Sequence, residues 1–436
     1  MLDFARLTQE VAKARLVTAQ GRVRQVIGMV IESQGPGIAV GSLCEVTAGR
    51  GRAPILAEVV GFRHGSVLLM PLGEMRGVEP GSLVRLVAEQ ALAPVGKSLL
   101  GRVMDGLGQP LDDGGPLVVD DWRPLYAEPQ NPMARERIKE PVDVGVRVLN
   151  GLLTLGKGQR IGIMAGSGVG KSTLLGMIAR HTAADVSVIA LIGERGRELR
   201  EFIERDLGKA GLARSVVVVA TSDQPPLVRL RGAYLATAIA ELFRDQGRDV
   251  ILMMDSVTRF AMSSREVGLA IGEPPTARGY TPSVFAQLPR LLERAGTRQG
   301  KGSITGIYTV LVEGDDMNEP IADAVRSIVD GHVVLTRELA SQGHYPAIDV
   351  LASVSRCMSD IVPKKQRESA IRLLDTLATY RRSEDLINIG AYVKGSSQRI
   401  DQAIAMIDKI NRYLRQPVEE RVTFADAVTS LAKLVG

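Results

Sequence analysis

Hydrophobic and polar positions follow three different patterns along the chain. The first, over residues 21–93, consists of short runs rich in β-branched residues, such as Val26–Ile31, Ile55–Val60 and Val67–Met70, separated by turns rich in Gly and Pro. Strands at a spacing of about ten residues with such turns are typical of a small antiparallel barrel. We therefore predict an N-terminal β-barrel over residues 21–93.

The second pattern, over residues 94–363, alternates apolar strands with amphipathic helices after an irregular stretch that is rich in Gly and Pro. The predicted strands are Gln159–Ala165, Val186–Ile192, Val216–Ala220 and Val250–Met254, and the predicted helices are Ser172–His181, Arg197–Leu207 and Ala233–Phe243. This alternation indicates an α/β core with a parallel sheet that helices cover on both faces.

The third pattern, over residues 364–436, is helical, as in the apolar stripe of Ile371, Leu374 and Ala378. It predicts a C-terminal helical domain. Residues 1–20 form a further segment, in which residues 2–17 carry apolar positions at helical spacing and predict a helix. Such a segment either packs on its own domain or forms an exposed arm that binds a partner.

Composition narrows the classes of function. The chain has 436 residues, with 54 Lys and Arg against 49 Asp and Glu, and its formal charge of +5 is too weak a bias to indicate a nucleic-acid partner. Aromatic residues make up only 4%, so a surface for stacking bases is not expected. No apolar run approaches the ~20 residues that span a bilayer, and the N-terminus lacks the apolar core of a signal peptide. We therefore expect a cytoplasmic protein.

One segment carries a clear chemical signal. The run from Ala165 to Ser172 is a P-loop, with Ala at the first position where the general pattern has Gly. Its glycines let backbone N–H groups curl around phosphate oxygens, and the following helix favours an anion at its N-terminus. Lys171 can reach the β- and γ-phosphates, and the Ser172 hydroxyl can ligate Mg²⁺. The expected nucleotide contacts are Ala165, Gly166, Ser167, Gly168, Val169, Gly170, Lys171, Ser172 and Thr173.

Four further charged residues follow apolar stretches. Asp255 comes after five apolar residues, where a carboxylate is costly unless it is paired or holds a metal, and we expect it on the Mg²⁺ side of the site. The alternative is a helix N-cap. Glu194 follows Val186–Ile192 at the edge where open α/β sheets bind ligands, so we expect it to be the catalytic carboxylate, with Arg195 contacting the nucleotide. Arg356 also follows an apolar stretch, but by itself such an arginine is more often structural.

These pieces together resemble the rotary ATPases. AGSGVGKS, GER at 193–195, DSVTRF at 255–260, PTARGYTPSVFAQLPR at 275–290 and EGDDMNEP at 313–320 recur in that family. The sequence is similar to the catalytic β subunit of ATP synthases and, more closely, to the type III protein-export ATPases. The stretches LINIGAYVKGSS at 386–397 and 22–41 resemble the flagellar branch more than the injectisome branch. The resemblance covers the chain from about residue 20 to its end.

The resemblance implies a fold and roles for individual residues. The fold is an N-terminal β-barrel, a RecA-like P-loop ATPase domain and a C-terminal helical domain, and six copies form a ring with nucleotide at the subunit interfaces. Glu194 would activate water, and Arg195 and Arg259 would line the phosphates. Arg356 would be an arginine finger that acts on the neighbouring subunit, and Tyr345 would flank the adenine or else pack beside Pro346.

The resemblance also implies partners and leaves rival functions open. Expected partners are a dimeric regulator at the N-terminal segment, a coiled-coil stalk protein, export substrates with their chaperones, and a membrane export gate at the inner membrane. The rivals are an injectisome secretion ATPase, a β-type ATP synthase subunit, an RNA translocase with the same core, and a ring subunit that binds nucleotide without hydrolysing it. The carboxylate Glu194 argues against the last, because non-catalytic relatives lack it.

Overall fold

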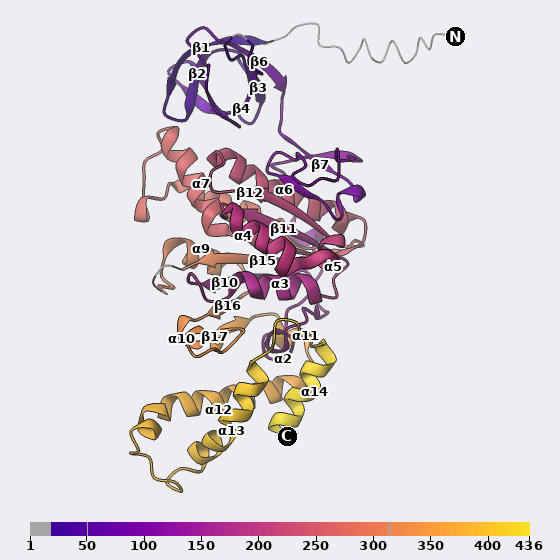
Figure 1. Cartoon of the computed structure of the whole chain (residues 1–436), viewed down its shortest axis with the longest axis vertical. Coiled ribbons are helices and arrows are strands. Elements are labelled where there is room, and N and C mark those ends of the chain that lie inside the picture. The colour runs from indigo at the N-terminus through magenta and orange to yellow at the C-terminus, as the bar shows by residue number, and fades with distance from the viewer. Residues whose placement is uncertain (1–18, 50, 313, 315) are drawn as a thin grey trace, which may run out of the picture. The chain divides into compact units, whose positions relative to one another are not determined.

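A computed structural model describes residues 19–49, 51–312, 314 and 316–436. The predicted N-terminal helix at residues 2–17 therefore lies outside the described residues. The chain divides into two compact units (Figure 1). One holds the N-terminal residues to Leu92 together with Pro225–Leu227 and Glu266–Pro274, and the other holds the rest.

The first unit is a closed antiparallel barrel with the strand order β1-β2-β5-β4-β3-β6. Its strands are β1 (Gln20–Ile27), β2 (Val30–Gln34), β3 (Leu43–Val46), β4 (Ile55–Arg63), β5 (Ser66–Pro71) and β6 (Leu83–Ala88). The predicted barrel is therefore confirmed. The predicted strand Val26–Ile31 is wrong, because Gly28 adopts a φ of 56° and turns the chain between β1 and β2.

The second unit is built on a nine-stranded sheet with the order β17-β16-β10-β15-β13-β11-β12-β8, on which β14 pairs with β15. All neighbours are parallel except β17 with β16 and β14 with β15. The strands are β8 (Val103–Asp105), β10 (Arg160–Ala165), β11 (Val186–Ile192), β12 (Ser215–Ala220), β13 (Asp249–Asp255), β14 (Gly296–Thr297), β15 (Ser303–Leu311), β16 (Gly331–Leu335) and β17 (Ile348–Ser355). Sequence patterns missed β8, which lies in the irregular stretch. A separate pair joins β7 (Leu92–Val95) to β9 (Asp121–Pro124).

Helices lie on both faces of this sheet, as the alternating pattern predicted (Figure 1). The helices between the barrel and the C-terminal part are α2 (Arg147–Leu152), α3 (Lys171–His181), α4 (Gly196–Glu201), α5 (Gly208–Ala213), α6 (Pro226–Asp245), α7 (Val257–Ala270), α8 (Pro282–Leu292), α9 (Pro320–Ile328), α10 (Arg337–Ser341) and α11 (Met358–Ile361). The predicted helix Arg197–Leu207 is instead α4 followed by a π-helical segment, Phe202–Leu207.

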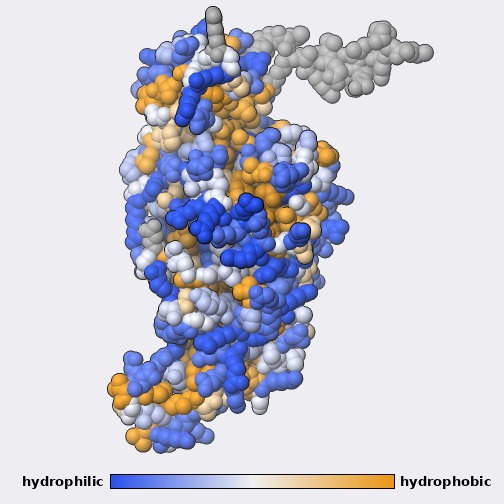
Figure 2. All heavy atoms as spheres, in the orientation of Figure 1, coloured by the Kyte–Doolittle hydropathy of each residue, from blue (hydrophilic) through white to orange (hydrophobic). Residues whose placement is uncertain are grey.

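Three helices form the C-terminal part: α12 (Lys364–Asn388), α13 (Gln398–Leu414) and α14 (Phe424–Val435). The helical character is confirmed, and the stripe of Ile371, Leu374 and Ala378 is only partly buried, with Leu374 packed against the core of the second unit. Ile371 is 58% exposed, whereas Leu373 and Leu377 are buried in the core of the second unit. Two neighbouring apolar stripes exist on α12, and only packing decides which of them is buried. Leu386 and Ile389, around the end of α12, are exposed. Figure 2 shows hydrophobic residues on the surface of the C-terminal part.

Within the described ranges, no helix is long and apolar enough to cross a membrane. The predicted domain bounds at residues 20, 93 and 363 remain predictions.

Candidate active site

The P-loop lies between β10 and α3, at the carboxyl edge of the sheet. Gly170 stands directly before α3 with a φ of 88°, a left-handed conformation that favours glycine. Val169 is buried and packs into the core, which anchors the loop, whereas Ser172 at the start of the helix is exposed. Because the first backbone N–H groups of α3 have no intrahelical acceptors, this end of the helix favours an anion.

Three charged side chains meet beside the loop. The ammonium group of Lys171 donates a hydrogen bond to Oδ1 of Asp255 and lies 3.7 Å from Oε1 of Glu194. Asp255 ends β13, and its side chain is only 5% exposed. The Thr309 hydroxyl on β15 donates to the same Asp255 oxygen at 2.7 Å. A buried charge is costly unless it is paired, so the two carboxylates stabilise Lys171 in this position.

Glu194 has the protonation behaviour of a base that works near neutral pH. It follows β11, and its side chain is 17% exposed. Burial, and secondly repulsion from Asp255, raises the pKa of Glu194 to about 7, although Lys171 acts in the opposite direction. A general base is most effective when its pKa lies near the operating pH.

A cavity of about 620 Å³ opens over these groups. Its wall consists of the P-loop, the start of α3, the segment after β11, and residues from β15, α7 and α10. The lining residues are Gly166, Ser167, Gly168, Gly170, Lys171, Ser172, Thr173, Gly193, Glu194, Arg195, Glu198, Arg259, Leu311, Val312, Gly314 and Arg337. The sequence therefore predicted much of this wall, including the P-loop, Glu194, Arg195 and Arg259.

The three arginines of the wall are held differently. Arg195 is 80% exposed and lies 3.7 Å from Glu198. Arg259 is more enclosed, and among the described residues its buried Nε has no hydrogen-bond partner. An unpartnered guanidinium nitrogen at a cavity wall fits a site that receives a phosphate oxygen. Arg337, at the start of α10, was missed by sequence reasoning.

Two other predicted residues lie in different places. The Tyr345 ring lies beside Gly170 of the P-loop, where a Cβ added to Gly170 would lie 3.4 Å from a ring carbon. Arg356 lies where the parallel strands begin, at the opposite end of the strands from the P-loop. It follows Ser355, which pairs with Gly331 at the start of β16, and β16 runs parallel to β10. The structure does not bring Arg356 to the P-loop of its own chain.

The residues missed by sequence reasoning differ in how they could have been found. Arg337 lies two residues after the end of β16. Because ligands bind beyond the carboxyl ends of parallel strands, this position could have been recognised from the sequence. Thr309 lies inside β15 among apolar neighbours. Only the packing of β15 against β13 brings its hydroxyl to Asp255.

The donors present fit Mg²⁺ bound together with phosphates. Mg²⁺ is usually held by one or two carboxylates, water and substrate phosphates. Here the Ser172 hydroxyl lines the cavity, and the buried Asp255 carboxylate accepts a hydrogen bond from Lys171, which lines it too. Over residues 19–49, 51–312, 314 and 316–436, no group of three or more His, Cys, Asp or Glu side chains could hold a metal by itself. The phosphates would therefore complete the coordination.

Comparison with known proteins agrees with this geometry. The ATP synthase alpha/beta family, nucleotide-binding domain, matches residues 145–355, and its beta-barrel domain matches 23–87. The T3SS EscN ATPase C-terminal domain matches residues 362–433. The "Flagellum-specific ATP synthase" of Bacillus subtilis is 56% identical over 95% of both chains. The chain belongs to the type III secretion ATPases of the ATP synthase alpha/beta family.

Other members of this family show the same relationship. The "Type 3 secretion system ATPase" of Xanthomonas euvesicatoria is 50% identical and covers 98% of this chain and 97% of its own. The structure of the assembled ATPase EscN from enteropathogenic E. coli has a TM-score of 0.90 and 45% identity over 95% of this chain and 100% of EscN. The predicted family, the barrel–RecA-like core–helical fold and the ATPase activity are therefore confirmed, and the family's nucleotide-binding domain supports ATP binding.

Proposed function

We propose that this ATPase hydrolyses ATP at the subunit interfaces of a homohexameric ring and so drives or primes the unfolding and export of flagellar proteins. The names of its relatives support this function, and EscN is described as an assembled ATPase. A type III injectisome role is the second candidate, because the Xanthomonas relative shares 50% identity.

The observation that carries the interface mechanism is the place of Arg356. The P-loop follows the end of β10, whereas Arg356 lies near its beginning, and six residues of strand span about 20 Å. Arg356 is exposed, and its guanidinium makes a marginal contact of 3.5 Å with the Arg326 carbonyl oxygen. An arginine so placed reaches the phosphates of a neighbouring subunit more readily than those of its own.

The remaining roles follow from the cavity. Lys171 binds the β- and γ-phosphates, and Ser172 and Asp255 would hold Mg²⁺, which would neutralise phosphate charge. Glu194 orients the attacking water and accepts its proton, because its raised pKa lets it be protonated near neutral pH. Catalysis then depends on positioning and charge stabilisation rather than on a covalent intermediate.

The other predicted residues would contact the phosphates and the adenine ring. Arg195 and Arg259 line the phosphate side, and Tyr345 flanks the adenine beside Gly170. The P-loop contacts predicted from Ala165 to Thr173 remain part of this proposal.

The partners and location of the ring are also proposals. EscN has been solved "in complex with its central stalk EscO", and that structure shares 45% identity with this chain. We expect a stalk protein here as well, and the exposed Leu386, Ile389 and Val393 offer it an apolar contact. A dimeric regulator at residues 1–20, chaperones with substrates, and an export gate at the inner membrane complete the set.

The test measures ATPase rate against protein concentration while the oligomeric state is followed by light scattering. Because the finger comes from a neighbour, specific activity should rise cooperatively as rings assemble. A specific activity that stays flat from monomer to hexamer would contradict the interface mechanism. A hexamer without phosphate release would favour a nucleotide-binding ring that does not hydrolyse.

A further inference from the structure

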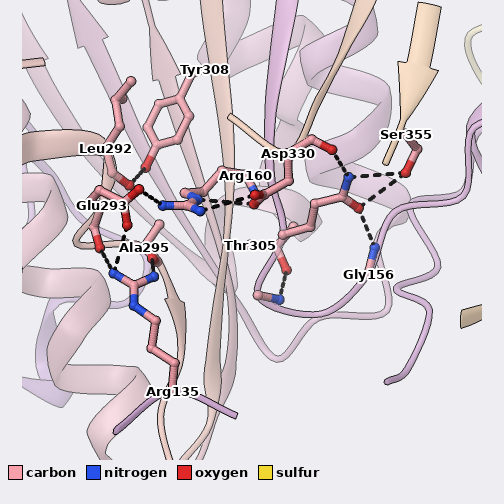
Figure 3. Close-up of polar contacts among 12 residues, drawn as sticks. Arg135, Gly156, Arg160, Leu292, Glu293, Ala295, Thr305, Tyr308, Asp330 and Ser355 are labelled. Atoms are coloured by element: carbon pink, nitrogen blue, oxygen red, sulfur yellow. Dashed lines mark hydrogen bonds and ion pairs between the residues drawn. The ribbon is translucent and has the colours of Figure 1, made fainter. Parts of the chain in front are cut away.

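A polar network adjoins the backbone of Arg356, at the ends of the strands opposite to the P-loop, and Figure 3 shows its side chains. Its centre is Asp330, the residue before β16. The backbone N–H of Arg356 donates to the Asp330 carbonyl oxygen at 3.0 Å. The fully buried Gln159 donates through Nε2 to the same carbonyl at 3.0 Å. One carbonyl therefore fixes the backbone from which the Arg356 side chain extends.

The Asp330 carboxylate is itself held by the first residue of the P-loop strand. Arg160 donates from its backbone N and from Nε to Oδ2, at 3.0 and 3.1 Å, and from Nη2 to Oδ1 at 3.1 Å. On its other side, Arg160 pairs with Glu293, which also lies 3.1 Å from Arg135. Figure 3 shows this run of alternating charges from Arg135 to Asp330.

A second branch holds the residue before Arg356. Ser355 donates through its hydroxyl to the Thr154 carbonyl oxygen at 2.7 Å, and Gln159 donates to that hydroxyl at 3.1 Å. The amide oxygen of Gln159 accepts from the N–H of Gly156 at 2.8 Å. Ser355, which precedes Arg356, and Asp330, which accepts its backbone hydrogen bond, are thus both held by buried or partly buried groups, although Arg356 itself is exposed.

We propose that Asp330, held by Arg160 and assisted by Gln159 and Ser355, is a positioning residue for Arg356 and therefore serves the active site of the neighbouring subunit. The inference rests on the proposed role of Arg356 as a finger. Its physical basis is that an exposed side chain on a flexible backbone would lose the orientation that charge stabilisation needs, and a misplacement of about 1 Å can cost on the order of 100-fold in rate.

The position of the network offers a rival explanation. Arg160 begins β10, and β10 leads to the P-loop, so Asp330 could instead support the nucleotide site of its own chain. The two explanations differ in which subunit of a mixed ring loses activity. Asp330→Asn removes the charge paired with Arg160 and keeps the shape of the side chain.

The experiment mixes full-length variants at equal amounts and measures ATPase activity of the assembled rings. Lys171→Ala lacks its own site and keeps its finger, and Arg356→Ala has the reverse defect. In their mixture, about a quarter of the interfaces combine an intact site with an intact finger. Recovery of activity in this first mixture tests the finger itself. Its absence would overturn the proposed function before Asp330 is considered.

The same design then tests Asp330. We expect Asp330→Asn to lower kcat by about 10- to 100-fold with an unchanged KM for ATP. Its activity should recover when it is mixed with Lys171→Ala and not when it is mixed with Arg356→Ala. The opposite pattern would overturn the inference and assign the network to the chain's own P-loop. Recovery in neither mixture, after the first mixture has succeeded, would also overturn it.

Two further variants keep the result clear. Asp375→Asn removes the same charge from an exposed ion pair with Arg399, and we expect wild-type activity from it. Should Asp330→Asn fail to assemble, Ser355→Ala replaces it, because it loses the bond to the Thr154 carbonyl oxygen and leaves the Asp330–Arg160 pair intact. We expect Ser355→Ala to show a smaller loss of kcat. Its activity should likewise recover in a mixture with Lys171→Ala and not in a mixture with Arg356→Ala.

Discussion

The two edges of the central sheet hold their charged residues in opposite ways. At the carboxyl edge, Lys171, Asp255 and Glu194 are largely buried and contact one another. At the other edge, Arg356 is exposed, and it is the backbone behind it that is fixed. The first arrangement suits a site that receives small charged groups from solvent. The second suits a side chain that is presented to another copy of the chain.

The largest effect should come from removing the exposed Arg356 side chain. Arg356→Ala should lower kcat by about 10³-fold or more, because arginine fingers contribute 10³–10⁵ in related phosphoryl transfers. Nucleotide binding by the monomer should not change, since Arg356 is remote from its own P-loop. Steady-state kinetics together with a fluorescent-nucleotide titration measure both. Arg399→Ala, another exposed arginine, is the control, and equal losses in the two variants would remove the distinction between the edges.

Removing the proposed base tests the buried side. Glu194→Gln should lower kcat by about 10²- to 10⁴-fold while ATP still binds, because the amide keeps the shape of the side chain and cannot accept a proton. Single-turnover phosphate release is the measurement. Glu204→Gln, in an exposed pair with Arg200, is the matched control. Hydrolysis at a near-normal rate by Glu194→Gln would exclude Glu194 as the base.

The pH dependence of the ATPase rate tests Glu194 and the buried charged residues further. Glu194 accepts a proton only as a carboxylate, and its pKa is raised to about 7. Activity should therefore be present above pH 7 and be lost as the pH falls, with kcat/KM about tenfold lower at pH 6 than at pH 8. A pH–rate profile measures this. The residual activity of Glu194→Gln should lack the step, and a profile of the same shape in that variant would assign the titration to another group.

The smallest effect should come from the adenine side. Tyr345→Ala should raise the KM for ATP by about fivefold and leave kcat nearly unchanged, because a stacked ring contributes on the order of 1 kcal/mol. Tyr345→Phe keeps the ring and should resemble the wild type. Initial rates over a range of ATP concentrations separate the two parameters. If Tyr345→Phe were as impaired as Tyr345→Ala, the hydroxyl rather than the ring would matter.

The sequence by itself determined the residues whose chemistry is tied to local spacing. The P-loop is recognisable because glycines, Lys171 and Ser172 must follow one another between a strand and a helix. Asp255 and Glu194 were predictable because each directly follows a buried strand, and such ends share one edge of a parallel sheet.

Only the tertiary structure decided what depends on neighbours from distant parts of the chain. Thr309 on β15 reaches Asp255 on the neighbouring strand β13. Asp330 joins Arg160 to Arg356, which are 196 positions apart in the sequence. The stripe of α12 that packs inward was likewise set by its partners. Side-chain pairing and burial arise from packing between elements, and their energies cannot be assigned before the elements meet.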